Sequence, residues 1–401
     1  MARLFTCGFE ENNLTATMWT GTDNNAPSVG TTAPHSGTYR LDTASAAGTS
    51  GVNRSLSAGK TSGTVWVRFY FRASDATPSA DTNIFISRNV GVSATGGVIN
   101  LLTSGVLRLN NAISATNTDG ATVLANDTWY RIEFRHLIAE SPSGELEMRL
   151  YLGDSTTALD TLTITGEDTR PTDIGNFRFA KGTTGPAGVT FSYDDIAIND
   201  DSGTFQNSWC GPGKIAMLVP NTEVTIGFTP LSGTDNSDMV NDLPGAPDDD
   251  TSYNTTATDA TVDRLGLTAL PAEVTADATI TLADVYGRMR GDGTTGTRTA
   301  RVKIWDEGGT LTNGPDSNLI DNTAYRIFTT AEHLVLDTAG KTKANLADFD
   351  AGYEETASND NMFVTALWVN VEWLEAAAAS TARHGPLLGF KRNRLVNPLA
   401  A

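Results

Sequence analysis

Glu145 and Glu147 come nearer than other residues of this sequence to the pattern of a catalytic pair. Because side chains two residues apart on a β-strand share one face, both carboxylates would point the same way. Two carboxylates that face one glycosidic bond supply a nucleophile and a general acid. The next alternate position on this strand face holds Arg149 and not a third acid. We therefore favour a solvated strand face over an active site.

The other motifs that could carry chemistry are incomplete. Asp194 and Asp195 are adjacent, so on a regular strand they point to opposite faces, and we interpret them as hydrogen-bonding residues at a β-bulge. The AGKT runs at 58–61 and 339–342 end like a phosphate-binding loop but lack its first glycine. The four histidines are scattered, and neither HExxH nor GxSxG occurs. The sequence predicts no catalytic residue, no cofactor and no enzymatic activity.

A metal site is also not expected. Acidic stretches at 194–201 and 248–250 offer the oxygen ligands that Ca²⁺ prefers, but neither has the DxDxDG spacing of a calcium loop. An acidic chain contains such clusters by composition alone. Cys7 and Cys210 are the only cysteines and form no CxxC motif, so we interpret them as reduced, unpaired thiols.

Four aromatic residues are the candidates for stacking on the sugar rings of a glycan. They stand on predicted strand faces opposite the apolar one: Trp66, Tyr70, Trp129 and Tyr151. An exposed aromatic ring offers a sugar a flat apolar surface. The alternative, at least as strong in a protein made of two sheets, is that this face packs against another sheet or a neighbouring molecule.

Composition and charge restrict the class of protein. The chain has 401 residues and a formal net charge of −19, and it is rich in turn-forming residues, which indicates two or three β-rich domains. An acidic body lacks the basic stripe that nucleic-acid binding requires. No apolar run approaches the roughly 18 residues of a membrane span. The first residues do not resemble a signal peptide. We expect no nucleic acid or membrane partner and assembly in a cytoplasm.

Short alternating stretches predict strands along most of the chain. The clearest are 64–72 and 362–374, and turn residues separate many similar ones. The sequence therefore predicts an all-β protein with an N-terminal jelly-roll sandwich over residues 1–205. A second β-sandwich domain follows over residues 206–375, and a short non-globular C-terminal arm over 376–401.

Two stretches carry weaker signals. Residues 20–62 are polar and show little periodicity, so we expect turns and only one short strand there, Tyr39–Leu41. Residues 343–351 are compatible with one short helix, for which Asn345 is the candidate N-cap.

The order of several short motifs resembles laminin-G-like, or concanavalin-A-like, jelly rolls. In residues 1–205 the motifs are, in order, CGFEENN, HSGTYRL, VWVRFYFR, SGVLRLNN, NDTWYRIEFR, GELEMRLYL and FSYDDIAIND. The most similar versions are those of structural proteins of tailed bacteriophages. In the second half, NSWCGPGKIAMLVPN, PDDDTSY and VTALWVNVEWL resemble a domain that follows the jelly roll in such proteins. The resemblance implies a virion protein without a known enzymatic role.

The C-terminal segment differs in character from the rest. Residues 376–401 contain four basic residues and no acid, so the body before them is even more acidic than the whole chain. We expect this segment to be a subunit-docking arm, held by apolar anchors and by cations that meet an acidic surface. Its candidate contact residues are Arg383, Leu387, Leu388, Phe390, Lys391, Arg392, Arg394 and Leu395.

These observations predict a structural component of a tailed-phage virion that decorates the capsid, neck or tail. We expect a homo-oligomer whose partners are other virion structural proteins, in a virion assembled in the cytoplasm of the host bacterium. The alternative is a carbohydrate-binding module that attaches the virion to a glycan of the host surface. A glycoside hydrolase ranks last, because jelly rolls that resemble glucanases carry three acids on one strand face as ExDxE or ExDxxE, and this motif is missing here.

Overall fold

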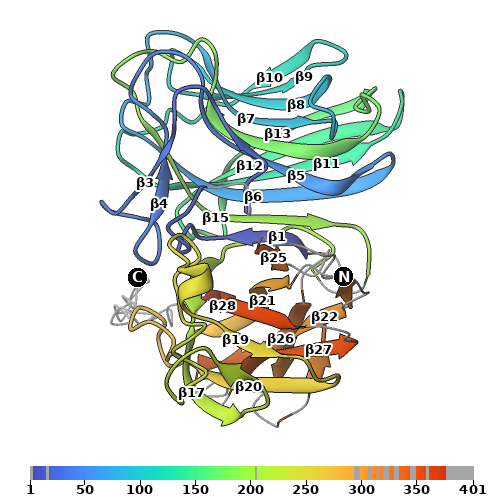
Figure 1. Ribbon diagram of the computed structural model, residues 1–401. Coiled ribbons are helices and arrows are strands. Elements are labelled where there is room, and N and C mark those ends of the chain that lie inside the picture. Colours follow the sequence, from blue (N-terminus) through green and yellow to red (C-terminus); the bar gives the residue numbers. More distant parts are fainter. Residues whose placement is uncertain are drawn as a thin grey trace, which may run out of the picture.

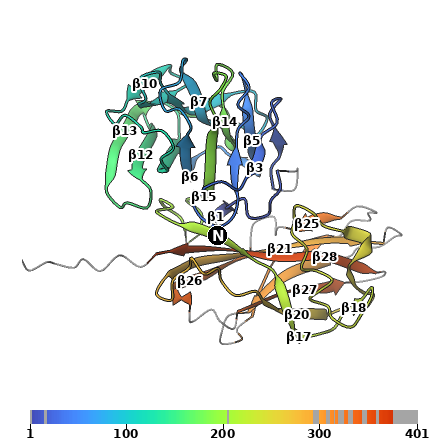
Figure 2. The same cartoon turned by 90° about the vertical axis from the view of Figure 1, so that its left-hand side faces the viewer.

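A computed structural model of the chain describes residues 3–14, 18–203, 206–292, 299–305, 309, 311–314, 316–318, 325–328, 334–343, 349–357 and 361–375. Its strands form four antiparallel sheets that stack as two sandwiches, one above the other (Figures 1 and 2). The described residues contain no α-helix, and the short 3-10 helix η1 (Asp249–Thr251) lies between two strands of the second sandwich. The predicted all-β fold with two successive sandwiches is therefore confirmed, while the predicted arm over 376–401 lies outside the described residues.

The first sheet holds eight strands in the order β13-β12-β11-β6-β15-β4-β3, and β1 also pairs with β15. These strands are β1 (Arg3–Cys7), β3 (Ser28–Gly30), β4 (Arg40–Asp42), β6 (Gly63–Ala73), β11 (Tyr130–Ile138), β12 (Gly144–Leu152), β13 (Ala158–Glu167) and β15 (Phe191–Asp200). Strand β6 contains the predicted strand 64–72. As its alternation indicated, Val65, Val67, Phe69 and Phe71 are buried in the core.

The second sheet covers the apolar face of the first, in the order β10-β9-β8-β7-β14-β5-β2. Its strands are β2 (Gly21–Thr22), β5 (Ser50–Lys60), β7 (Thr82–Arg88), β8 (Thr95–Leu101), β9 (Leu107–Asn111), β10 (Thr116–Asp119) and β14 (Ile174–Lys181). Aromatic rings from both sheets meet between them: Phe69 lies 5.3 Å from Phe85 and 5.5 Å from Phe179, measured between ring centroids. This packing closes the first sandwich.

The third and fourth sheets form the second sandwich. The third has the order β18-β19-β28-β21-β25, with β16 paired to β28 and β26 to β21; the fourth has the order β17-β20-β27-β22-β23, with β24 paired to β22. The third-sheet strands are β16 (Lys214–Leu218), β18 (Thr229–Pro230), β19 (Asn254–Thr256), β21 (Thr279–Gly291), β25 (Arg326–Phe328), β26 (Leu334–Thr342) and β28 (Met362–Leu374). The fourth-sheet strands are β17 (Pro220–Thr225), β20 (Thr261–Leu267), β22 (Thr299–Trp305), β23 (Leu311–Asn313), β24 (Ser317–Asn318) and β27 (Asp350–Ala357).

The helix predicted over 343–351 is wrong at its C-terminal end. Asp350 and Ala351 belong to β27, where they pair with residues of β20 and β22. Residues 344–348 lie outside the described residues. A stretch this short carries too few residues for its pattern to distinguish a helix from a strand.

Strand β28 joins the two sandwiches, because both of its faces are buried. Leu367 and Val369, the neighbours of Trp368 in the strand, lie in the core of the second sandwich. Trp368 points to the opposite face and belongs to the core cluster of the first sandwich, where it stacks on Tyr286 of β21 with a centroid distance of 5.3 Å. The first and third sheets therefore pack against each other, with β1 and β15 facing β28 and β21 (Figure 1).

The described part of the chain contains no apolar helix of the length that a bilayer crossing requires.

Candidate functional site

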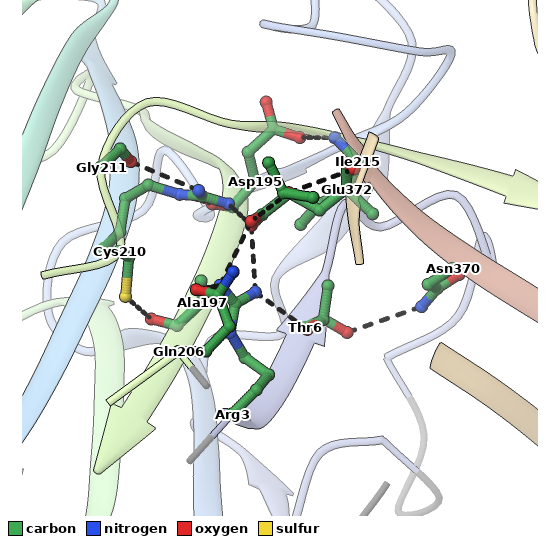
Figure 3. Close-up of polar contacts among 12 residues, drawn as sticks. Arg3, Thr6, Asp195, Ala197, Gln206, Cys210, Gly211, Ile215, Asn370 and Glu372 are labelled. Carbon is green, nitrogen blue, oxygen red and sulfur yellow. Dashed lines mark hydrogen bonds and ion pairs between the residues drawn. The ribbon is translucent and has the colours of Figure 1, made fainter. Parts of the chain in front are cut away.

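A buried ion cluster lies where the first and third sheets meet, and Figure 3 shows its contacts. The Glu372 carboxylate of β28 lies 3.0 Å from Arg3 Nη1 and 2.7 Å from Arg68 Nη2. Arg3 also donates from Nε to the Asn199 side-chain oxygen at 2.6 Å, and Thr281 donates to Glu372 at 2.9 Å. We call Arg3, Arg68 and Glu372 the seam triad. It connects β1 and β6 of the first sandwich to β28 of the second.

Electrostatics keep the seam triad ionised. Burial alone would raise the pKa of Glu372, but the guanidinium groups of Arg3 and Arg68 outweigh it and lower the pKa to about 2. Burial alone would likewise lower the pKa of Arg68, and the charge of Glu372 reverses that effect and raises the pKa. The triad therefore fixes one arrangement of the two sandwiches, since the side chains of all three residues are at most 1% exposed.

Asp194 and Asp195 form the β-bulge that the sequence indicated. The register between β15 and β6 shifts between Asp194 and Ala197, and Asp195 has a φ of 46°. Because of the bulge, both carboxylates reach the same loop rather than opposite faces: Asp194 accepts from the His35 backbone N–H at 2.8 Å, and Asp195 accepts from the Ser36 hydroxyl at 2.8 Å. Asp195 also accepts from the backbone N–H of Ile215 at 2.8 Å, which adds a contact to the second sandwich.

The outward side chains of β6, β11 and β12 form a ladder of alternating arginine, glutamate and aromatic residues. Cross-strand pairing places Arg131 between Tyr70 and Tyr151, and Glu133 between Arg68 and Arg149. We call the whole set the polar ladder: Trp66, Arg68, Tyr70, Arg131, Glu133, Arg135, Glu145, Glu147, Arg149 and Tyr151. Such cross-strand neighbours lie close enough to interact directly.

One half of the polar ladder is buried. Arg131 donates to Glu133 at 2.8 Å, and its guanidinium lies 4.0 Å from the centroid of the Tyr151 ring. Arg68 donates to the backbone oxygens of Asp195 at 3.0 Å and of Gly211 at 3.3 Å. The segment between the two sandwiches therefore reaches Arg68 through Gly211, while Arg131 also donates to the backbone oxygens of Gly153 and Ser155 in the β12–β13 connection.

The other half is partly exposed: the side chains of Arg135, Glu145 and Arg149 are 25–33% exposed, whereas Glu147 between them is buried. Glu147 accepts from Arg149 at 2.7 Å and lies 3.4 Å from Arg135, which also pairs with Glu145. The Arg149 guanidinium lies 4.0 Å from the centroid of the half-buried Trp209 ring. We call Arg135, Glu145, Glu147, Arg149 and Trp209 the open end of the ladder. The exposed residues Thr161, Thr163 and Thr165 of β13 border it and pair with Arg149, Glu147 and Glu145.

The four predicted stacking residues do not act as one set. Tyr70 is fully buried and Tyr151 is 7% exposed, so neither ring offers an open face to a sugar. The cause is the packing alternative noted for this face: Tyr70 donates its hydroxyl to Asp154 at 2.6 Å, and Tyr151 lies under Arg131. Trp66 and Trp129 are half-buried, and a stacking role for them stays a prediction.

Trp209 and His35 lie in the motifs NSWCGPGKIAMLVPN and HSGTYRL but were not candidate site residues, and the fold brings them to opposite ends of the ladder. His35 lies 2.6 Å from Asp195 through Nδ1 and 3.3 Å from Asp154 through Nε2, and its ring stacks on Tyr70 at 3.5 Å. Burial lowers the pKa of His35, but the two carboxylates outweigh it and raise the pKa above its ordinary value. Lys214 of β16 lies 3.4 Å from Asp154, so this cluster is a second link between the sandwiches.

The remaining sequence motifs have structural explanations. The first AGKT run ends strand β5 with its residues 58–60, and the second lies in β26, so neither lies in the loop between a strand and a helix that binds phosphate. Cys7 and Cys210 are both free thiols. In the described ranges, no group of three or more histidine, cysteine, aspartate or glutamate side chains is placed to hold a metal ion. The predicted docking residues between Arg383 and Leu395 lie outside the described residues.

Comparison with known proteins gives similarity in fold. No family model matches the sequence, and no curated protein matches it. A solved structure of endo-β-1,4-glucuronan lyase from Trichoderma reesei is 15% identical and covers 47% of this chain and 93% of its own, with a TM-score of 0.35. The PL-14 alginate lyase from Aplysia kurodai is 9% identical and covers 49% of this chain and 97% of its own, with a TM-score of 0.37. Lectin II from Ulex europaeus is 12% identical and covers 44% of this chain and 90% of its own, with a TM-score of 0.31.

These similarities correct the conclusion that the chain is not an enzyme. That conclusion rested on the missing acids of a glycoside hydrolase. Two of the three solved structures described above are named as lyases. A lyase cleaves by elimination and does not need the three-acid strand pattern, so a missing third acid says nothing about that chemistry.

Proposed function

We propose that this chain is a saccharide-binding structural protein whose binding surface is the open end of the polar ladder. The observation that carries the proposal is the grouping of the partly exposed Arg135, Arg149 and Trp209 around the buried carboxylate of Glu147. Charged groups of both signs can donate to and accept from sugar hydroxyls, while an indole ring packs on the apolar face of the sugar. The three threonines at the border add further hydroxyl groups.

The joined sandwiches support a structural role alongside binding. Two buried contacts, the seam triad and the core packing of Trp368, hold the first sandwich in one orientation on the second. A fixed orientation reduces the conformational entropy lost when several copies bind one surface together. Weak single sites would then give strong attachment when many copies are displayed.

The test is a glycan array probed with the purified full chain and with single variants. Trp209→Ala and Arg149→Ala should each weaken binding to the recognised polysaccharide by about tenfold, or about 1.4 kcal/mol. Arg108→Ala is the matched control, because Arg108 is a partly exposed arginine that pairs with Asp119 on the opposite sheet. Absence of binding to any polysaccharide, or equal loss in the control, contradicts the proposal. The same polysaccharides should be incubated with the chain and assayed for the unsaturated products of elimination.

A place in a tailed-phage virion stays our prediction, supported by the resemblance in the ordered motifs. Removal of residues 383–401 should abolish incorporation into particles while both sandwiches remain folded. Circular dichroism and thermal unfolding of the truncated protein provide the folding control. Normal incorporation of the truncated chain would refute the docking role of the arm and leave the saccharide proposal untouched.

A further inference from the structure

The connection between β3 and β4, residues 31–39, lies over one end of the polar ladder, and we call it the strap. Because β3 and β4 pair with each other, the strap is the tip of a hairpin. Within it, the His35 ring stacks on Tyr70 with a centroid distance of 3.5 Å and meets Trp129 edge to face at 5.9 Å. Trp129 also donates from Nε1 to the carbonyl oxygen of Ala33 at 3.2 Å. The strap therefore covers two of the four aromatic residues that were candidates for stacking on sugars.

His35 fastens the strap to two carboxylates. The protonated ring donates from Nδ1 to Asp195 at 2.6 Å and from Nε2 to Asp154 at 3.3 Å. Its side chain is 7% exposed, so water screens these charge-assisted hydrogen bonds little. A neutral ring carries one N–H and can donate to only one of the two carboxylates. Loss of a proton therefore removes one contact of the strap and leaves an acceptor nitrogen facing a carboxylate.

The strap has a strained tip and a separately fixed base. Ala33, in the tip, has a φ of 49°, in the left-handed region that favours glycine. Strain of this kind persists only where the surrounding contacts enforce it. At the base, the Thr38 N–H donates to Glu10 at 2.9 Å and the Gly37 N–H donates to Glu273 at 2.9 Å. These base contacts do not involve His35, so the tip can open while the base stays in place.

The two carboxylates set the direction in which pH acts on His35. Burial lowers the pKa of His35, but the hydrogen bonds and charges of Asp154 and Asp195 outweigh it and raise the pKa above the ordinary value of 6.5. Because the folded-state pKa is raised, the contribution of His35 to holding the strap is complete below pH 6.5. It is lost as the pH rises through the folded-state pKa.

Other titratable and charged groups lie near the ring or its two partners. They come from four elements: Tyr70 of β6, Arg131 of β11, Asp194 of β15 and Lys214 of β16. Burial and the charge of Asp195 raise the pKa of Asp194, which accepts the His35 backbone N–H, so ionisation of Asp194 would strengthen that contact. Glu10, whose pKa burial raises to about 8, acts in the same direction on the base. Release at high pH is therefore expected from His35 and is opposed by these acids.

We propose that His35 is a pH-dependent fastener of the strap, and that its deprotonation releases residues 32–36 and uncovers the rings of Tyr70 and Trp129. Histidine suits this task because its charge changes near neutral pH. Release would lengthen the face open to a saccharide, from the open end of the ladder to Trp129. That consequence rests on the proposed function, whereas the opening of the strap does not.

Hydrogen–deuterium exchange of the full chain, read by mass spectrometry in peptides that span the strap, tests the proposal. Labelling times at pH 6 and pH 9 are scaled to the intrinsic exchange rate at each pH. The strap amides should be protected about tenfold less at pH 9, while strand β6 beneath them keeps its protection. Equal protection of the strap at both pH values overturns the proposal. A parallel loss in β6 also overturns it, because the whole first sandwich would then be opening.

Three variants assign the effect to His35. His35→Asn keeps a donor near the position of Nδ1 but carries no charge, so its strap should exchange at pH 6 as the wild-type strap does at pH 9. Asp154→Asn should move the transition to lower pH, because one of the two carboxylates that stabilise the protonated ring is gone. Glu10→Gln is the control and should keep the transition, since Glu10 holds only the base. Wild-type protection in H35N, an unmoved transition in D154N or a lost transition in E10Q overturns the proposal.

The glycan array, repeated at pH 6 and pH 9, separates this inference from the proposed function. The wild-type chain should bind the recognised polysaccharide more tightly at pH 9, and H35N should bind at pH 6 as the wild type does at pH 9. Release of the strap in the exchange experiment without glycan binding at either pH would support the fastener and contradict the proposed function.

Discussion

Replacing Glu372 by glutamine should strongly destabilise the chain, although the two side chains have the same shape. The change removes the only charge of the seam triad that opposes Arg3 and Arg68, both of which are fully buried. Breaking a buried ion pair by removing one partner typically costs about 3–5 kcal/mol. The pKa of Glu372 leads to a similar magnitude, because its fall from 4.5 to about 2 corresponds to about 3 kcal/mol of stability.

The pH dependence of this contribution follows from the direction of the shift. Because the folded-state pKa of Glu372 is below its ordinary value, the stabilisation is complete above pH 4.5. It decreases as the pH falls from 4.5 toward about 2, where the folded state also takes up the proton. E372Q should therefore lose this part of the acid dependence as well as the stability at neutral pH.

Urea unfolding of E372Q and of Glu375→Gln at pH 7 is the decisive measurement. Glu375 follows the same strand, but its carboxylate is 54% exposed and pairs with Lys214 at 2.5 Å, so its loss should cost less than about 1 kcal/mol. Tryptophan fluorescence and far-ultraviolet circular dichroism should be followed together, since two sandwiches can unfold in separate steps. If E372Q is as stable as E375Q, the triad does not hold the sandwiches together and the reasoning is refuted.

Three further changes test other parts of the fold. Burial lowers the pKa of His136 to about 4, so wild-type stability should fall between pH 6.5 and pH 4 by about 3 kcal/mol, and His136→Gln should flatten that region of a pH–stability curve. Trp368→Ala should cost about 3–5 kcal/mol and lower the unfolding midpoint of both sandwiches, whereas Val302→Ala, in the core of the second, should act there alone. Gly51→Ala should cost about 1–3 kcal/mol in urea unfolding, because its new Cβ would overlap the Phe179 backbone oxygen; wild-type stability in this variant would show that the strands can separate without cost.

Strands with strong alternation were predictable from the sequence, and strands without it were not. Strand β6 appears as predicted because its apolar residues alternate with aromatic and charged ones that point to the other face. Strand β5 (Ser50–Lys60) was missed, since SGVNRSLSAGK contains few apolar residues and of these Val52 is fully buried. This strand is positioned by its ladder with β14, a partner more than a hundred residues away, and such pairing leaves no local pattern.

The candidate site was also predictable only in part, because it depends on which later segments of the chain cover the outward sheet face. The alternation of β6 correctly placed Trp66 and Tyr70 on the outward face, but nothing local indicates which part of that face a later segment will cover. Trp209 follows the last strand of the first sandwich and reaches Arg149 only through the folded path of the chain. Glu372 shows the same limit, because its position on an alternating strand predicts exposure, whereas the first sandwich buries it.

The residues of the seam triad are synthesised at very different times. Arg3 and Glu372 are 369 residues apart in the chain. At a translation rate of about 5–20 residues per second, roughly 20 to 70 seconds pass between the two residues leaving the ribosome. During that interval the first sandwich can fold, yet its Arg3 and Arg68 have no carboxylate partner from β28 and its seam faces water. The nascent chain therefore carries an uncovered cationic and apolar surface, which a chaperone or another copy could occupy before the second sandwich arrives.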